Sequence, residues 1–258
     1  MKKIFNEGEM RYKALILQNA RGEGPGVFAD FLKVKDWDSE TIHLDQGGVI
    51  PSAWRSCDLL VVMGGPMNVY EEVIYPYLIE ETKVIGEALQ RGLPVLGFCL
   101  GAQLMAKSFG AKVMKGHKKE IGWYRVQMTD EGGRDPFLRL FPKELFVFQW
   151  HSDTFQLPEG AVRLVCSDDY MNQAMRVGSM GYGFQFHFEI TREMIDQWLV
   201  TGQEEVEEMG EKGVSKKILK DAEIHLSEAH AYAALFFNNY LDEIVRSSEP
   251  GQGLLSGG

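Results

Sequence analysis

The chain has 258 residues, of which 45% are hydrophobic and 25% charged, and its formal net charge is −10 at pH 7. This composition excludes global disorder, and the length allows one large domain or one domain with an appendage. The acidic balance argues against binding of nucleic acid or an anionic membrane surface, because little positive charge is available to neutralise phosphate groups.

Cysteine usage and hydropathy indicate a cytoplasmic protein. The cysteines are too few, and odd in number, for a disulfide framework: Cys57, Cys99 and Cys166. Residues 1–9 contain no apolar stretch of the kind that a secretory signal needs, and no apolar run is long enough for a transmembrane helix. We therefore expect a reducing compartment, in which a cysteine is free to act as a thiol.

From Lys13 to Gly110 the sequence alternates between strand-like and helix-like segments. Short apolar runs predict strands, and apolar residues at helical spacing predict the helices between them. This alternation favours parallel strands in a layered α/β fold. The predicted strands are Lys13–Gln18, Thr41–Leu44, Asp58–Met63 and Pro94–Phe98, and the predicted helices are Val27–Val34, Leu78–Arg91 and Ala102–Phe109.

After Ala111 the pattern consists mostly of strands. We expect them to continue the same sheet, because no Pro/Ser-rich linker intervenes. Thr191 then has the position of an N-cap for a helix that ends near Val200. The predicted strands are Trp123–Met128, Leu145–Trp150, Ala161–Cys166, Gln173–Arg176 and Tyr182–Glu189.

The C-terminal part has a different texture. The acidic run 204–208 is typical of a solvated helix face, and Lys216–Val245 carries one apolar stripe at helical spacing, which indicates a long helix that packs on the core or on a partner. The Gly/Ser-rich residues 247–258 predict a disordered tail. We therefore divide the chain into a main domain (1–200), a helical extension packed on it (201–246) and the tail.

Cys99 lies between a predicted buried strand and a predicted helix, with Gly97 and Gly101 on either side. This is the pattern of a nucleophile elbow with Cys in place of Ser. The glycines make room for a strained turn, and the helix N-terminus favours a thiolate over a thiol. The alternative is a buried structural cysteine between two glycines that allow close packing.

The segment 182–189 alternates strictly, with aromatic residues at even positions and polar residues or glycine at odd positions. The alternation places His187 and Glu189 on one face of one strand, where the carboxylate can orient the imidazole. Cys99, His187 and Glu189 then form a nucleophile, a base and an orienting group. The alternative is a strand with a polar outer face. The other histidines show no comparable partner at short range: His43, His117, His151, His225 and His230.

Two further segments carry candidate binding groups. Gly64 and Gly65 end a predicted strand before Pro66, and the free amide of Gly65, with that of Leu100, could form an oxyanion hole. An ordinary turn is the alternative. The segment 149–153, which includes His151 and Ser152, places polar groups at a predicted strand end, where either substrate contacts or a loop cap is expected. We decline a phosphate-loop interpretation of the glycine-rich segment 22–26, because it lacks the required third glycine.

Together these motifs resemble those of the class I, triad-type glutamine amidotransferases. Residues 97–103 match the G-x-C-x-G-x-Q elbow of that family, and residues 185–189 match its Q-F-H-P-E strand, except for Phe188 in place of proline. Residues 64–66 and 150–153 resemble its oxyanion and W-H-S-D segments, and residues 120–123 resemble its stand-alone, GMP-synthase-like subgroup. The resemblance covers residues 12–190.

The resemblance implies a three-layer, flavodoxin-like α/β fold with a mostly parallel central sheet, here with a C-terminal helical extension. It also implies a glutaminase that needs no cofactor or metal. Cys99 attacks the γ-carboxamide carbon, His187 transfers protons and Glu189 orients His187. Gly65 and Leu100 hold the oxyanion, while Gly64, Gln103, His151 and Ser152 contact the substrate.

Three functions remain open at this stage. The chain could be the amidotransferase subunit of a two-component enzyme, with a separate synthetase that receives the ammonia. It could be a stand-alone hydrolase of γ-glutamyl amides or peptides, or a protein that binds a γ-glutamyl ligand or a partner without turnover. The intact Cys, His and Glu set favours the two enzymatic alternatives.

Overall fold

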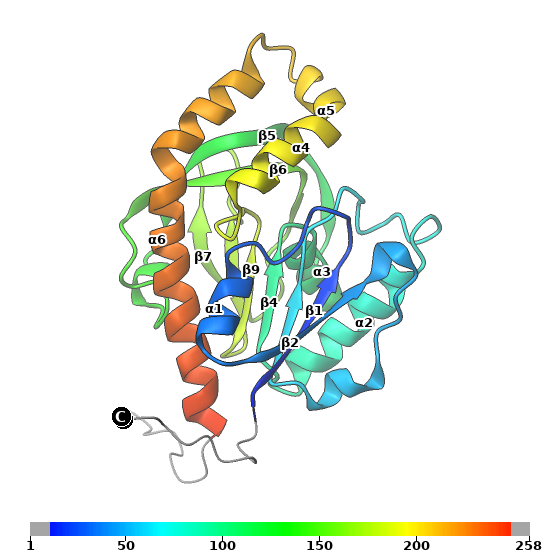
Figure 1. The fold of residues 1–258 in the computed structure, drawn as a ribbon. Coiled ribbons are helices and arrows are strands. Elements are labelled where there is room, and N and C mark those ends of the chain that lie inside the picture. The colour runs from blue at the N-terminus through cyan, green and yellow to red at the C-terminus, as the bar shows by residue number, and fades with distance from the viewer. Residues whose placement is uncertain (1–10, 249–258) are drawn as a thin grey trace, which may run out of the picture.

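The computed structural model describes residues 11–248, which form a central sheet flanked by helices (Figure 1). The N-terminal stretch 1–9 and most of the predicted tail lie outside the described residues. The strand order in the sheet is β2-β1-β3-β4-β9-β8-β7-β5-β6. The α/β class with a flanked central sheet agrees with the prediction.

The parallel part of the sheet contains five strands. The apolar runs of β1, β3, β4 and β9 are buried on both faces, because helices cover each side, whereas the edge strand β2 is largely exposed. β4 pairs in parallel with both β3 and β9, and Phe98 aligns with Phe184. The carboxyl ends of these strands therefore meet at one edge. The strands are β1 (Lys13–Gln18), β2 (Asp38–His43), β3 (Leu59–Val62), β4 (Val95–Phe98) and β9 (Gly181–Phe184).

The rest of the sheet is antiparallel. It forms the other side of the molecule, where β5 and β6 are long paired strands (Figure 1). These antiparallel strands form a larger part of the sheet than we expected. Consecutive strands here join directly, without a crossover helix. The strands are β5 (Val113–Met128), β6 (Glu144–Phe155), β7 (Val162–Cys166) and β8 (Ala174–Val177).

Helices cover both faces of the parallel strands. Alternate residues of β1 and β3 point to opposite faces, and the two hydrophobic clusters divide accordingly. One face packs against α2 (Tyr77–Gln90) and α3 (Leu100–Ser108). The other packs against α1 (Phe28–Val34) and the C-terminal helix α6 (Val214–Ser248). Short 3-10 helices occupy Leu44–Gln46, Ser52–Ser56 and Gly132–Arg134.

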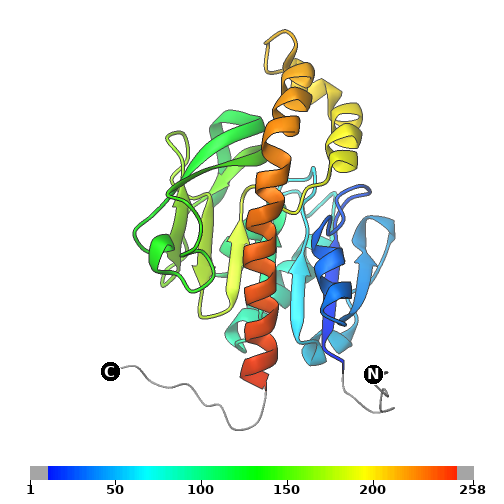
Figure 2. The ribbon, with the colours of Figure 1, turned by 60° about the vertical axis from the view of Figure 1, so that its left-hand side comes forward.

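The C-terminal extension is continuous with the core. α6 crosses the whole height of the molecule in front of the sheet (Figure 2), and Phe236, Phe237 and Tyr240 are fully buried against it. α4 (Arg192–Thr201) begins at Thr191, whose side chain accepts a hydrogen bond from the Met194 amide as predicted. α5 (Gln203–Glu207) follows at once. Ser247 and Ser248, predicted as the start of the tail, belong to α6.

Two predictions about strands were wrong. The predicted strand over residues 182–189 stops at Phe184, so His187 and Glu189 lie beyond it. The W-H-S-D segment 150–153 lies inside β6, which extends to Phe155, and not at a strand end. Separately, no helix within residues 11–248 is long and apolar enough to cross a membrane.

Candidate active site

Cys99 occupies the sharp turn between β4 and α3. Its φ of 48° and ψ of −105° form a conformation that non-glycine residues rarely adopt. The neighbouring glycines leave no room for a side chain: a Cβ on Gly97 would lie 2.7 Å from the Gly101 carbonyl carbon, and one on Gly101 would lie 2.2 Å from the Val62 oxygen. The backbone therefore holds the thiol in a strained position at the carboxyl edge of the sheet.

His187 and Glu189 form a buried pair next to this turn. The distance between His187 Nδ1 and Glu189 Oε1 is 2.6 Å, and both side chains are almost fully buried. The two residues still face the same side although β9 has ended, because the His187 amide donates to Phe148 O on β6 at 2.8 Å. The backbone thus stays extended by exchanging one partner strand for another.

The charge state of His187 follows from its partners. Burial, the largest single influence, lowers the pKa of His187. The negative charge and the hydrogen bond of Glu189, with the neighbouring Cys99 side chain, act in the opposite direction, and together they raise the pKa well above its ordinary value. The imidazole is therefore a good proton acceptor beside Cys99.

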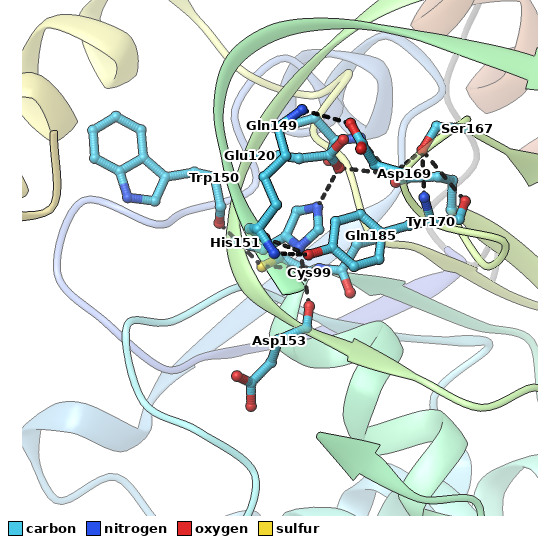
Figure 3. Close-up of polar contacts among 12 residues, drawn as sticks. Cys99, Glu120, Gln149, Trp150, His151, Asp153, Ser167, Asp169, Tyr170 and Gln185 are labelled. Atoms are coloured by element: carbon cyan, nitrogen blue, oxygen red, sulfur yellow. Dashed lines mark hydrogen bonds and ion pairs between the residues drawn. The ribbon is translucent and has the colours of Figure 1, made fainter. Parts of the chain in front are cut away.

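Two groups hydrogen-bond with the Cys99 sulfur (Figure 3). Gln185 Nε2 lies 3.5 Å from Sγ, and Sγ donates to the Trp150 carbonyl at 3.6 Å. Gln103 Nε2 in turn donates to Gln185 Oε1 at 3.1 Å and to Asp153 O at 3.3 Å. Gln185 was not singled out from the sequence as a site residue, although it shares the alternating polar face with His187.

His151 has a buried partner 31 residues away in the sequence, where the search for partners at short range could not find it. His151 Nε2 lies 2.9 Å from Glu120 Oε2, and His151 Nδ1 lies 3.0 Å from Asp153 O (Figure 3). Glu120 Oε2 also accepts from Gln173 Nε2 at 2.9 Å. Both nitrogens of the His151 ring therefore face oxygen acceptors inside the protein, and neither is available to a substrate.

A cavity of about 220 Å³ opens beside the Cys99 turn. This is below the range of roughly 300–1,000 Å³ that drug-sized ligands need, so the cavity fits an amino-acid-sized ligand. Gly65, Gln103, His151 and Ser152 line it, as the sequence prediction requires, whereas Gly64 and Leu100 lie behind the lining. The other lining residues are Ala20, Arg21, Glu23, Pro66, Met67, Asn68, Cys99, Trp150, Asp153, His187, Trp198, Thr201, Gly202 and Glu205.

Leu100 and Gly64 nevertheless belong to the two backbone turns that border the cavity. Leu100 is the first residue of α3, where amide groups have no intrahelical acceptor. Gly64 lies against the His187–Glu189 pair, because a Cβ built on it would come within 3.3 Å of His187 Cε1. Across residues 11–248, no group of three or more His, Cys, Asp or Glu side chains could hold a metal ion.

Glu23 is a cavity residue that the sequence analysis passed over. It belongs to the glycine-rich segment that we declined as a phosphate loop. Its Oε2 atom lies near the Cα atom of Gly64, where a Cβ would come within 2.4 Å of it. Burial raises the pKa of Glu23 to about 7, while the charge of His187 lowers it and the charges of Glu189 and Glu205 raise it further. A carboxyl group that titrates near neutral pH thus faces the His187 imidazole.

The start of the C-terminal extension forms one wall of the same cavity. The Trp198 ring lies edge-on to His187, with centroids 4.9 Å apart, and Trp198 Nε1 donates to Gly22 O at 3.0 Å. Gly202 and Glu205 line the cavity next to it. The loop that carries Glu23 and the helices α4 and α5 therefore close the site together.

Phe188, which replaces proline in the family motif, is anchored by α6. It is 1% exposed and stacks on Phe237 with centroids 5.1 Å apart. His230, also on α6, lies 2.8 Å from the Ile190 carbonyl through Nε2. The long helix thus contacts the residues on both sides of Glu189, which accounts for an aromatic side chain at position 188.

Comparison with known proteins identifies the family. A model of the family described as glutamine amidotransferase class-I matches residues 31–201. The chain belongs to this family. Cys99, His187 and Glu189 all lie within the matched range, whereas Glu23 and Glu205 lie outside it.

Relatives and solved structures of class-I glutamine amidotransferases agree with this assignment. The chain is 31% identical over 187 residues to the glutamine amidotransferase-like protein YfeJ of Salmonella typhimurium, which covers 71% of this chain and 78% of that protein. A crystal structure of a glutamine amidotransferase from Thermotoga maritima has 33% identity and a TM-score of 0.81, covering 92% of this chain and 99% of the other. One from Methylobacillus flagellatus has 29% identity and a TM-score of 0.82, covering 90% and 95%.

Other relatives are larger proteins or are named as subunits. The glutamine-hydrolysing GMP synthase of Thermosipho melanesiensis is 30% identical over 183 residues, which are 70% of this chain but only 31% of that protein. A glutamine-hydrolysing GMP synthase subunit of Methanoculleus marisnigri is 30% identical over 160 residues, covering 61% of this chain and 79% of that relative. The chain therefore corresponds to under a third of the larger synthase.

Proposed function

We propose that this class-I glutamine amidotransferase hydrolyses the γ-carboxamide of glutamine, or a γ-glutamyl amide, through a thioester on Cys99. One observation carries the proposal: a thiol in a strained elbow and a buried imidazole line the same cavity, and the imidazole hydrogen-bonds with a buried carboxylate at 2.6 Å. This is the arrangement of a nucleophile, a base and an orienting group in covalent amide hydrolysis.

In the first half-reaction His187 takes the proton of the Cys99 thiol, and the sulfur adds to the γ-carbonyl carbon. His187 then gives that proton to the nitrogen of the leaving group, and the C–N bond breaks. Ammonia or an amine is released, and a γ-glutamyl thioester remains on Cys99. The hydrogen bond from Nδ1 to Glu189 leaves Nε2 as the nitrogen that exchanges protons with sulfur and leaving group.

In the second half-reaction water replaces the amine. His187 accepts a proton from water as the oxygen adds to the thioester carbon, and the C–S bond then breaks. Glutamate, or the corresponding γ-glutamyl acid, leaves, and the proton returns to the sulfur. Glu189 stays ionised throughout and stabilises the imidazolium that forms in each half.

Backbone amides of Gly65 and Leu100 are our candidates for the oxyanion hole, because Gly65 lines the cavity and Leu100 is the first residue of α3, directly after Cys99. Gly64, Gln103 and Ser152 are our candidates for contacts with the α-amino acid end. We correct the role of His151: its ring nitrogens are engaged by Glu120 and Asp153, so the ring supports the cavity wall and does not bind substrate.

Two alternatives exist for the fate of the released ammonia or amine. Relatives named as separate subunits of GMP synthase favour a synthetase partner. The closed wall formed by α4 and α5 favours a stand-alone hydrolase, because Trp198 and Glu205 occupy one side of the cavity. Either role needs a free thiol at Cys99, which fits a reducing, cytoplasmic location.

The test is turnover by the purified full-length chain. Glutamine and a series of γ-glutamyl amides and peptides are supplied separately, and released ammonia or amine is measured for the wild type and for C99A. We expect turnover that C99A abolishes. Fast turnover of one γ-glutamyl peptide supports the stand-alone role, and slow turnover stimulated by a synthetase supports the two-component role. Binding of glutamine without any turnover would contradict the proposal.

A further inference from the structure

Two buried polar side chains, Glu81 and Asn19, lie beneath the Gly64–Gly65 turn. Glu81 belongs to α2 and Asn19 follows β1, and both are 0% exposed. Asn19 Nδ2 donates to Glu81 Oε1 at 3.2 Å and to the Met63 carbonyl at 3.1 Å. The pair therefore connects α2 and the end of β1 to the residue that immediately precedes Gly64.

The same pair contains two buried atoms without a partner. Asn19 Oδ1 and Glu81 Oε2 make no hydrogen bond within the described residues, although each is inaccessible to water. An unsatisfied buried acceptor destabilises the folded state, and an unpaired ionised carboxylate does so more strongly. A single proton on Glu81 Oε2 turns this oxygen into a hydrogen-bond donor. The unpartnered Oδ1 atom of Asn19 is then the acceptor for it.

We propose that Glu81 is a neutral carboxylic acid in the folded protein, that it forms a two-hydrogen-bond ring with the Asn19 amide, and that this ring positions the Gly64–Gly65 turn of the active site. In the ring Asn19 Nδ2 donates to Oε1, and the Glu81 hydroxyl donates to Asn19 Oδ1. Glu81 is thus a positioning residue that acts through Asn19 and the Met63 carbonyl.

The electrostatics of the surroundings support the neutral form. Burial raises the pKa of Glu81 to about 8, although the hydrogen bond from Asn19 lowers it. Tyr77, one turn away on α2, is the neighbouring titratable group, and burial raises its pKa. The Tyr77 hydroxyl donates to Asn19 O at 3.3 Å and stays neutral beside the pair.

The connection to the cavity is short. A Cβ built on Gly65 would come within 3.1 Å of Asn19 Cβ, so Asn19 packs directly against the turn that carries the proposed oxyanion donor. Ala20 and Arg21, which follow Asn19, line the cavity. Ionisation of Glu81 removes the donor to Oδ1 and places a buried negative charge under this turn.

The decisive variant is Glu81→Gln, because a glutamine side chain reproduces both hydrogen bonds of the protonated acid but does not titrate. Glu80→Gln, an exposed neighbour on the same helix, is the matched control. For wild type we expect kcat at saturating substrate to fall about tenfold between pH 7 and pH 9, following the acid with a pKa of about 8. In Glu81→Gln we expect the decline of kcat to occur at a pH higher by about one unit or more. At pH 7 the kcat of this variant should equal that of wild type.

This activity test rests on the proposed function, so a second measurement works without turnover. In wild type the folded state keeps the Glu81 proton from pH 4.5, the ordinary pKa, up to about pH 8, whereas the unfolded state releases it. Wild-type stability therefore declines with rising pH across that window. The thermal midpoint of Glu81→Gln, relative to that of wild type, rises from pH 4.5 to pH 8.

Infrared difference spectra between wild type and Glu81→Gln at pH 7 complete the test. We expect a protonated-carboxyl C=O band that only wild type and Glu80→Gln possess. An equal midpoint difference at all pH values, or absence of the band, would overturn the proposal. A kcat loss in Glu81→Gln at pH 7 would overturn the ring as well, because the amide would then fail to replace the acid.

If wild type turns over no substrate, the proposed function fails while the thermal and infrared measurements still decide the state of Glu81.

Discussion

At the scale of single residues, the proposed mechanism depends on the pair of His187 and Glu189. Glu189 Oε1 lies 2.6 Å from His187 Nδ1, and the second carboxylate oxygen has no other hydrogen-bond partner in the described part of the chain. The side chain of Glu189 therefore makes its hydrogen bond with the His187 imidazole alone among the described residues. Its function should appear in turnover and not in substrate affinity.

We predict that Glu189→Gln lowers kcat by about 10²–10⁴ and changes KM by much less, because the imidazolium loses its countercharge and its fixed tautomer. Steady-state kinetics with glutamine measures both constants. Glu193→Gln, an exposed residue of α4, is the control and should behave as wild type. An unchanged kcat in Glu189→Gln would remove this carboxylate from the mechanism.

Glu23 supplies a second prediction at this scale. Its carboxyl group has a pKa of about 7 and interacts with the charge of His187. Above pH 7 the ionised group stabilises the imidazolium, so Glu23→Gln should lower the pKa of His187 and shift to lower pH the limb of kcat/KM on which activity rises as His187 loses its proton. Profiles between pH 5 and pH 10 measure the shift, with Glu204→Gln on the exposed face of α5 as control. A shift to higher pH, or equal profiles, would contradict it.

The sequence predicted some of these residues and not others for a physical reason. Cys99 and His187 stand in local patterns, an elbow and an alternation, which the chain itself carries. Glu23 and Glu120 acquire their meaning only from partners far along the chain, His187 and His151 respectively. No spacing within one segment predicts such a contact. The contact between Glu81 and Asn19 is likewise between residues far apart in the sequence.

At the scale of elements, the C-terminal helix supports the catalytic segment. Phe188 stacks on Phe237 of α6, and His230 of the same helix lies within hydrogen-bond distance of the carbonyl after Glu189. The substitution of phenylalanine for the proline of the family motif is therefore matched by an aromatic surface on α6. The helix that the resemblance left without a function holds the backbone on which two proposed catalytic residues lie.

We predict that Phe237→Ala lowers the free energy of unfolding by about 3–5 kcal/mol, as expected for a fully buried phenylalanine, and also lowers kcat. Leu235→Ala, a more exposed position on the same helix, should cost less than about 1 kcal/mol and leave kcat unchanged. Urea denaturation and steady-state assays measure the two effects. Loss of stability without any loss of kcat would show that the contact of α6 with Phe188 does not position His187 and Glu189.

The strand that ended early shows what periodicity can and cannot predict. Alternation placed His187 and Glu189 on one side, and their side chains do meet there. It could not reveal that the Gln185 amide bonds to Gln173 beside β8 while the His187 amide bonds to Phe148 on β6. A change of partner strand is a tertiary event, which no pattern within one segment encodes.

At the scale of the whole molecule, the sheet and the extension share one hydrophobic cluster. Phe98 and Phe184 from the sheet pack with Phe236 and Phe237 from α6. The division of the chain at residue 200, predicted from texture, falls inside helix α4, and the segments on either side of it share this core. The apolar stripe of α6 predicted its burial, but the sequence left open whether its surface belonged to this chain or to a partner.

We predict a single cooperative transition when the full-length chain is heated, with equal calorimetric and van't Hoff enthalpies. A shared core has no interface at which the extension could melt alone. Differential scanning calorimetry at two heating rates makes the measurement. A separate low-temperature transition that disappears when residues 214–258 are removed would contradict the prediction.

The central claim is that Cys99 carries a γ-glutamyl group during turnover. The most direct measurement is intact-protein and peptide mass spectrometry after reaction with a glutamine analogue that bears an electrophilic carbon at the γ-position. We predict one adduct per chain, located on the peptide that contains Cys99, absent from C99A and suppressed by excess glutamine. Labelling at Cys57 or Cys166 instead, or no labelling of a folded wild-type protein, would contradict the account.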